Sequence, residues 1–182
     1  MKKLIAIICV VLLMGGVVML SGFTASENEK REDLFRIHIV ANSNESKDSE
    51  VKYEIKDKFS TFLTPMLANC ESKQEAQKIV SDNLENLKYI ANSVLSLRGL
   101  NYTATINIGR EFFPSRAYGE YVVESGEYSG ITVTLGEGKG DNWWCVLFPP
   151  LCYYNVTANY ANSNEVVYKV KILEIIKQFF EK

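Results

Sequence analysis

Several residue types that whole classes of protein depend on are scarce in this sequence. Its 182 residues contain one histidine and four cysteines, which excludes a histidine-rich catalytic zinc site. Lysine and arginine number 20 against 22 aspartate and glutamate, so no basic surplus exists to neutralise a phosphate backbone, and nucleic acid is not an expected partner. Neither a metal nor a cofactor is expected. With 47% hydrophobic and 12% aromatic residues, the chain is nevertheless typical of a packed globule.

Charged residues are also missing from the stretch between Leu4 and Ala25, which follows two lysines at the N-terminus. Its apolar part, residues 4–20, falls slightly short of the ~30 Å bilayer core but exceeds the ~7–15 residues of a usual signal-peptide core. Residues 1–25 are therefore predicted to be a signal peptide or an N-terminal membrane anchor. The lysines are expected to stay cytoplasmic, so the rest of the chain is secreted across the membrane. The leader, if uncleaved, is the only expected membrane contact.

Two amphipathic helices are predicted after the leader. The first begins at Ser46 or Ser49, carries apolar residues at three- and four-residue steps, and ends or bends near Pro65. The second begins at Ser72, where Ser-Lys-Gln-Glu has the spacing of a capping box, and continues to Arg98.

Alternating patterns predict strands. Residues 34–40 read Leu-Phe-Arg-Ile-His-Ile-Val, which places Arg36 and His38 on a more polar face. Further strands are predicted at 102–108, 121–124, 128–135 and 143–148, and the ambiguous tail at 165–173 is interpreted as a strand over 166–172 leading into a short terminal helix. The fold class is therefore α+β, with two amphipathic helices packed on a mainly antiparallel sheet. We assign residues 26–33 to a polar spacer and 34–182 to a single globular domain.

Rare residues gather between residues 112 and 154. The glycine-rich segment 136–140 lacks the Gly-x-Gly-x-x-Gly spacing and opens no helix, so a flexible connection is preferred over a phosphate site. Trp143 and Trp144 are adjacent on a predicted strand and point to opposite faces, so one can anchor the core while the other is exposed. Burial of both rings is the alternative. An exposed tryptophan beside Phe148, Pro149 and Pro150 would form a rigid aromatic anchor of the kind found at binding hot spots.

The cysteines leave two interpretations open. Cys145 and Cys152 are seven positions apart around the two prolines, and secretion would allow a disulfide between them to persist, but two buried free thiols are equally compatible with the sequence. Cys70 would stay unpaired. His38 with Cys145 or Cys152 is the one Cys–His combination open to a nucleophilic enzyme, yet no local signature accompanies it. The protein is therefore not expected to be an enzyme.

Longer motifs resemble a known family. They are residues 35–44 (Phe-Arg-Ile-His-Ile-Val-Ala-Asn-Ser-Asn), 113–119 (Phe-Pro-Ser-Arg-Ala-Tyr-Gly), 125–128 (Ser-Gly-Glu-Tyr) and 136–152, which includes Asp-Asn-Trp-Trp-Cys-Val-Leu-Phe-Pro-Pro-Leu-Cys. Together they resemble the stage II sporulation protein R family of endospore-forming bacteria, over residues 34–154. The chain departs from the family pattern at Asn44, where an aspartate is common, and at Glu124-Ser125, where Pro-Ala is common.

The resemblance implies a signalling domain without catalytic activity. Family members are made in the forespore and secreted into the space between forespore and mother-cell membranes. There they activate a membrane-embedded aspartic protease of the mother cell, which processes a sporulation sigma-factor precursor. The cluster of rare residues around the proline turn suggests a contact surface made of Asn142, Trp143 or Trp144, Phe148, Pro149 and Pro150, with Arg116 and Tyr118 as weaker candidates.

Two other functions remain open from the residues alone. One is an envelope module that stacks peptidoglycan sugars on the same tryptophans. The other is a Cys-dependent hydrolase that uses Cys145 or Cys152 with His38.

Overall fold

The computed structural model describes residues 33–118, 121–153 and 174–180. By its contacts the chain divides into two units, Met1–Asp33 and Leu34–Lys182, and all described residues except Asp33 lie in the second. The predicted leader, the spacer up to residue 32 and the predicted strand at 166–172 lie outside the described residues. Within the described ranges, no helix has the length and apolar character needed to span a bilayer.

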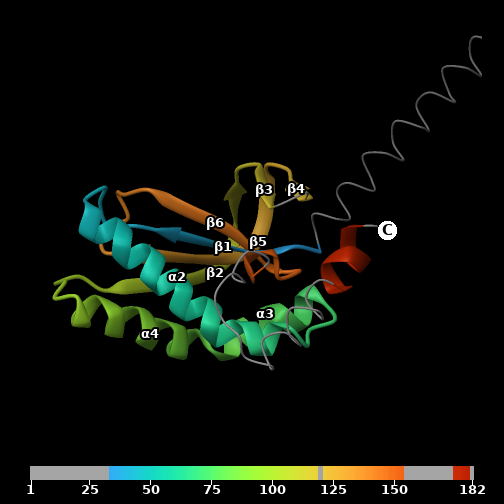
Figure 1. Cartoon of the computed structure of the whole chain (residues 1–182), viewed down its shortest axis with the longest axis horizontal. Coiled ribbons are helices and arrows are strands. Elements are labelled where there is room, and N and C mark those ends of the chain that lie inside the picture. Colours follow the sequence, from blue (N-terminus) through green and yellow to red (C-terminus); the bar gives the residue numbers. More distant parts are fainter. Residues whose placement is uncertain (1–32, 119–120, 154–173, 181–182) are drawn as a thin grey trace, which may run out of the picture. The chain divides into compact units, whose positions relative to one another are not determined.

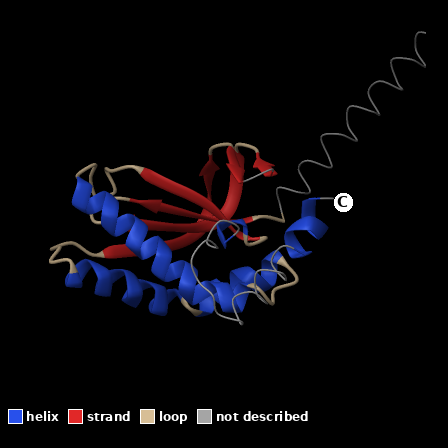
Figure 2. Cartoon of the chain, viewed as in Figure 1, coloured by secondary structure: helices blue, strands red, loops and turns tan. Residues whose placement is uncertain are grey.

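Among the described residues, four strands form the main sheet in the order β2–β5–β1–β6 (Figures 1 and 2). Their bounds are Phe35–Val40 for β1, Ala104–Phe113 for β2, Gly126–Leu135 for β5 and Asn142–Phe148 for β6. β1 pairs with β5 in parallel, whereas the pairs β1–β6 and β2–β5 are antiparallel. Isoleucine and valine alternate with threonine and asparagine in β2 and β5, as expected for strands with one buried face. The predicted α+β class with a mainly antiparallel sheet is confirmed.

Three helices pack along one face of this sheet: α2 (Ser46–Leu67), α3 (Lys73–Asp82) and α4 (Leu84–Leu97) (Figure 1). Their apolar residues recur at helical spacing, and these positions are the buried ones: Val51, Ile55, Phe59 and Leu63 in α2, and Leu87, Ala91, Val94 and Leu95 in α4. α3 starts where the sequence predicts, because the Ser72 hydroxyl accepts a hydrogen bond from the Glu75 amide at 3.2 Å.

The helix boundaries differ from the prediction at two points. Pro65 lies inside α2, which continues to Leu67, because a proline so near the helix end removes one backbone hydrogen bond while Leu67 is buried in the core. The helix predicted over 72–98 is interrupted at Asn83, whose φ of −110° and ψ of 12° leave the helical range. The Asn83 side chain donates to the Ile79 carbonyl at 2.9 Å and so satisfies part of the broken turn. In the described part of the chain, three helices, not two, therefore cover the sheet.

A second, smaller sheet lies on the side of the main sheet opposite the helices (Figure 2). It is a hairpin of β3 (Arg116–Tyr118) and β4 (Tyr121–Val123). After β6 the chain forms a short 3-10 helix, η1 (Leu151–Tyr153). Residues 174–180 are helical, in agreement with the predicted terminal helix.

β1 is more buried than its alternating pattern predicts. All six of its residues are buried, including Arg36 (0% exposed) and His38 (8% exposed), which the pattern places on a more polar face. The cause is its position: β1 is flanked by β5 and β6 within the sheet, and Tyr118 of the hairpin lies against Arg36. The expectation that this polar face is the wetter one is therefore wrong.

Candidate functional site

The alternation of side chains along β1 and β6 gives the sheet two different faces. Ile37 and Trp143 face α2, where they line a small depression. His38 and Trp144 are partners in the β1–β6 register and project from the opposite face. None of the described helices covers this opposite face, which we call the uncovered face (Figure 1). The two adjacent tryptophans therefore point to opposite sides of the sheet, as the strand pattern predicts.

A polar and aromatic cluster on the uncovered face is centred on Trp144. The His38 ring stacks on the Trp144 ring with 3.5 Å between centroids and 15° between planes. Its Nδ1 lies 3.2 Å from Glu111 Oε1, and its Nε2 lies 2.6 Å from Asn142 Oδ1. Phe113 contacts the same indole edge-on at 5.1 Å. We call these five residues the Trp144 cluster. Asn142 is exposed and Trp144 half-buried, so an amide and part of an indole are accessible on this face.

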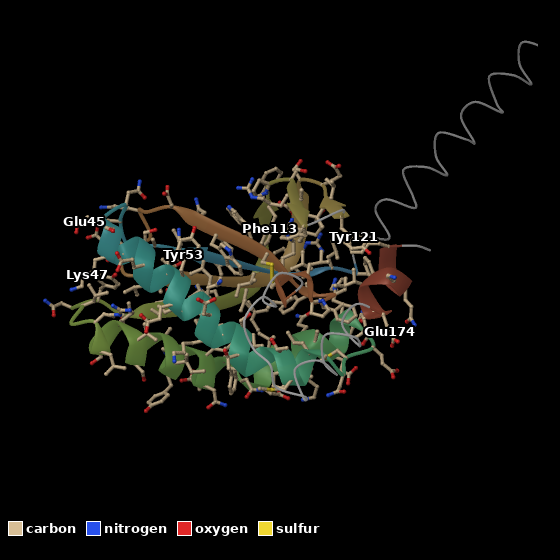
Figure 3. All side chains as sticks on the ribbon, viewed as in Figure 1. Glu45, Lys47, Tyr53, Phe113, Tyr121 and Glu174 are labelled. Carbon is tan, nitrogen blue, oxygen red and sulfur yellow. A yellow bond between two sulfur atoms is a disulfide. The ribbon has the colours of Figure 1, made fainter. Side chains whose placement is uncertain are left out.

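Arg36 lies beside this cluster at the hairpin end of the sheet. Its Nη2 donates to the Tyr118 hydroxyl at 3.1 Å, and its Nε lies 3.5 Å from the Cys145 carbonyl oxygen. The guanidinium is 4.4 Å from the Phe113 ring centroid and 4.9 Å from that of Tyr128. Figure 3 shows Phe113 and Tyr121 toward this end, away from Glu45 and Lys47 at the start of α2. Burial lowers the pKa of Arg36, and the hydroxyl of Tyr118 partly opposes this effect.

The residues predicted as partner contacts do not lie on one surface. Asn142 and Trp144 lie on the uncovered face, while Arg116 is exposed on the hairpin and Tyr118 is half-buried beside Arg36. Trp143 lies on the helix side. A contact role for these residues stays a prediction.

The predicted anchor of Phe148, Pro149 and Pro150 is not exposed. All three are buried. The chain turns back after Pro150, where a disulfide joins Cys145 to Cys152 and Leu151 enters the core, so the turn packs inward. The exposed aromatic group beside the prolines that the sequence suggests is therefore absent from this turn.

The cysteines do not form a catalytic pair with histidine. Cys145 and Cys152 are joined with 5.6 Å between Cα atoms, a usual disulfide spacing. The register places Cys145 opposite Ile37, on the other face from His38, and both nitrogens of His38 already face acceptors. Cys70 is free and buried, and burial, followed by the charge of Glu75, raises the pKa of its thiol to about 11. In the described ranges, no thiol is therefore placed beside the imidazole.

The glycine-rich segment 136–140 packs against the turn after β1. Asn42 accepts hydrogen bonds from two backbone amides of this segment. Glu137 N donates to Asn42 Oδ1 at 3.0 Å, and Lys139 N donates to the Asn42 carbonyl at 3.1 Å. Gly136 and Gly138 have φ of 55° and 60°, which favours glycine. The segment is therefore held in place, in contrast to the flexible connection expected.

The same turn holds a buried carboxylate. Asp48 Oδ2 accepts hydrogen bonds from Asn42 Nδ2 at 2.8 Å and Ser43 Oγ at 2.7 Å, and its Oδ1 accepts one from the Tyr102 hydroxyl. Burial alone would raise the pKa of Asp48, but these hydrogen bonds outweigh it, so the pKa is lower than usual. Two motifs far apart in the sequence, at residues 41–44 and 136–141, thus meet at one polar junction.

Sequence reasoning missed Asp48, Lys52 and Glu111. Lys52 is buried one turn after Asp48 and donates its Nζ to the Asp141 carbonyl at 3.0 Å. A signal for the first two was present, because helical spacing places positions 48 and 52 on the same side as Ile55. Glu111 had no local signal, since its partner His38 is 73 residues away.

Fold and site together describe a small α+β domain that carries a polar and aromatic cluster on an uncovered sheet face. In the parts of the chain that the structure describes, no group of side chains is arranged to hold a metal ion. A family model described as stage II sporulation protein R matches residues 31–158, which include the whole cluster. The chain therefore belongs to the stage II sporulation protein R family.

An individual relative agrees with this assignment. The stage II sporulation protein R of Bacillus subtilis (strain 168) is 36% identical over 162 residues, which cover 84% of this chain and 72% of the relative. No solved structure matches the chain.

Proposed function

We propose that this protein is a secreted sporulation signal. It is made in the forespore, enters the space between the forespore and mother-cell membranes, and activates a membrane-embedded aspartic protease of the mother cell. The protease then processes a sporulation sigma-factor precursor. Membership of the stage II sporulation protein R family over residues 31–158 is the observation that carries this proposal. The signal acts by binding, and it performs no covalent chemistry of its own.

The Trp144 cluster supports a recognition role for the uncovered face. Trp144 is held by His38 stacked on one face of its ring and by Phe113 in a T-shaped contact, so little side-chain entropy is lost when a partner contacts it. Asn142 offers exposed hydrogen-bonding groups beside it. Rigid aromatic groups flanked by polar ones are typical of binding hot spots.

The two tryptophans give a matched test. We expect Trp144→Ala to lower processing of the sigma-factor precursor about thirtyfold in sporulating cells, at equal protein level, because hot-spot truncations cost about 2 kcal/mol. Trp143→Ala should act mainly on stability, since this ring faces α2. Leu97→Ala serves as the control, because Leu97 is exposed on α4, away from the uncovered face.

Folding is checked by circular dichroism of the secreted domain. Normal processing by a folded Trp144→Ala variant would remove the cluster from the contact surface.

A pull-down on purified cell wall provides a second check, because a signalling protein should not be retained there. One face of the Trp144 ring is already occupied by His38, which reduces the platform open to a sugar. Strong retention would favour the envelope module over the signal.

A further inference from the structure

Arg36 is a completely buried cation, and no carboxylate contacts it among the described residues. Within the described part of the chain, its Nη1 has no hydrogen-bond partner. Buried charges in proteins are normally paired, and buried donors are normally satisfied, because leaving either alone in a low-dielectric interior is costly. The aromatic rings of Phe113 and Tyr128 compensate for part of the lost hydration, but they satisfy no N–H group. The guanidinium therefore has spare capacity for an anion.

The open part of this guanidinium has the geometry that a carboxylate recognises. Nη1 and Nη2 form one prong each of the planar fork that binds carboxylates through two parallel hydrogen bonds. The Tyr118 hydroxyl occupies the Nη2 prong alone, at 3.1 Å. A neutral hydroxyl is a weaker acceptor for a cation than a carboxylate oxygen, so an incoming carboxylate can replace it.

The hairpin provides the route to Arg36. β3 and β4 contain three residues each and pair with one another, not with the main sheet. Tyr118 is linked to the main sheet by its hydroxyl, which contacts Arg36 and the Trp144 carbonyl at 3.4 Å. A carboxylate that replaces the Tyr118 hydroxyl at Arg36 requires this side chain to rotate away, which breaks these two contacts. The exposed Arg116, two residues earlier, adds a second positive charge at the same end.

We propose that Arg36 binds a carboxylate of the protein partner. An acidic side chain of the partner enters beneath the β3–β4 hairpin, replaces the Tyr118 hydroxyl and pairs with both Nη1 and Nη2. The partner segment is therefore acidic, and it contacts the Trp144 cluster next to Arg36. This inference rests on the proposed function, since it specifies the chemistry by which the signal is recognised.

The test is a titration followed by NMR of the Arg36 Nε–H group in the ¹⁵N-labelled secreted domain. The probe is the blocked peptide acetyl-Gly-Glu-Glu-Gly-amide, and its matched control is acetyl-Gly-Gln-Gln-Gly-amide. We expect a saturable shift of the Arg36 signal with the glutamate peptide and none with the glutamine peptide. No saturable shift with the glutamate peptide, or an equal shift with both peptides, would overturn the proposal.

Two variants separate the fork from general attraction to positive charge. Tyr118→Phe removes the competing hydroxyl and should tighten glutamate-peptide binding about three- to tenfold, the equivalent of one ordinary hydrogen bond. Arg116→Ala removes only an exposed charge and should weaken binding by no more than a few-fold. Weaker binding by a folded Tyr118→Phe variant, or complete loss in Arg116→Ala, would contradict a site at Arg36. Neither result depends on substituting the buried arginine.

The same inference is checked separately against the signal function. Arg36→Lys keeps the charge but lacks the fork, so a folded variant should lose both peptide binding and precursor processing. Normal processing by this variant would overturn the proposal that Arg36 binds a carboxylate of the partner, but it would leave the proposed signal function intact. The peptide titration needs no protease, so it remains informative even if the protein activates a different target.

Discussion

Two polar residues of β1 are partnered to different extents. His38 has an acceptor at each ring nitrogen, whereas Arg36 has aromatic rings, the Tyr118 hydroxyl and the Cys145 carbonyl, and its Nη1 has no partner among the described residues. The alternating sequence correctly places both side chains on one face of the strand, but it predicts that this face is the wetter one. The groups that bury them, Glu111 and Tyr118, are 73 and 82 residues away in the chain. A period-two pattern carries no information about such distant partners.

Asp48 gives the sharpest prediction for a single side chain. Its carboxylate accepts three hydrogen bonds, and Asp48→Asn replaces one acceptor oxygen by an NH₂ group that faces another donor. We expect this variant to lower the free energy of unfolding by about 2–3 kcal/mol, and Tyr102→Phe, which removes one donor, by about 1 kcal/mol. Urea unfolding at pH 7 measures both. Equal losses for the two variants would contradict a network centred on the carboxylate.

The pH dependence of the same variant follows from the lowered pKa of Asp48. Burial raises this pKa, but hydrogen bonds from Tyr102, Ser43 and Asn42 outweigh burial. Because the folded pKa lies below the unfolded value of about 3.9, the stabilisation is complete at neutral pH and is lost as pH falls below about 4 through the folded pKa. The stability gap between the wild type and Asp48→Asn should therefore narrow in that acid range. A gap that stays constant down to pH 2 would contradict this account.

At the scale of elements, the sequence predicted those features that depend on neighbouring residues alone. The start of α3 at Ser72 and the strands β1 and β5 follow from capping and alternation. The continuation of α2 past Pro65 and the break at Asn83 do not, because tertiary packing of the last turn and a side-chain hydrogen bond decide them. The sequence therefore predicted the kinds of elements better than their ends.

The link between β6 and η1 supports a prediction about redox state. The Cys145–Cys152 disulfide closes a short loop, and loop-entropy arguments give such a crosslink about 2 kcal/mol of stability. We expect dithiothreitol to lower the melting temperature of the oxidised domain by several degrees. Thermal unfolding with and without the reductant measures this effect.

The matched control is the double variant Cys145→Ala/Cys152→Ala, in which the reductant should leave the melting temperature unchanged. Cys70 is present in both proteins, so it does not account for a difference between them. An equal response of the two proteins would show that the crosslink does not form in the folded chain.

At the scale of the whole molecule, the arrangement of layers decides which predicted contact residues are available. Asn142 and Trp144 were predicted from rare residues in one run, and the structure places them on the uncovered face. Phe148 and the prolines belong to the same run but are buried, because the chain turns back through the disulfide. Arg36 was visible in the sequence only as a polar strand residue. Its spare hydrogen-bonding capacity arises from packing of the hairpin against the sheet, which no local pattern encodes.

The proposed signal also requires the domain to reach the far side of the membrane, and the apolar run of the sequence lies within residues 4–20. We expect deletion of residues 1–25 to keep the protein in the forespore cytoplasm and to abolish precursor processing. Replacing these residues by an unrelated cleaved signal peptide should restore processing, because the family match begins only at residue 31. Immunoblots of precursor and product, with cell fractionation to locate the protein, measure both outcomes. Normal processing by the deletion variant, at normal level in the cytoplasm, would show that the signal does not act from outside the membrane.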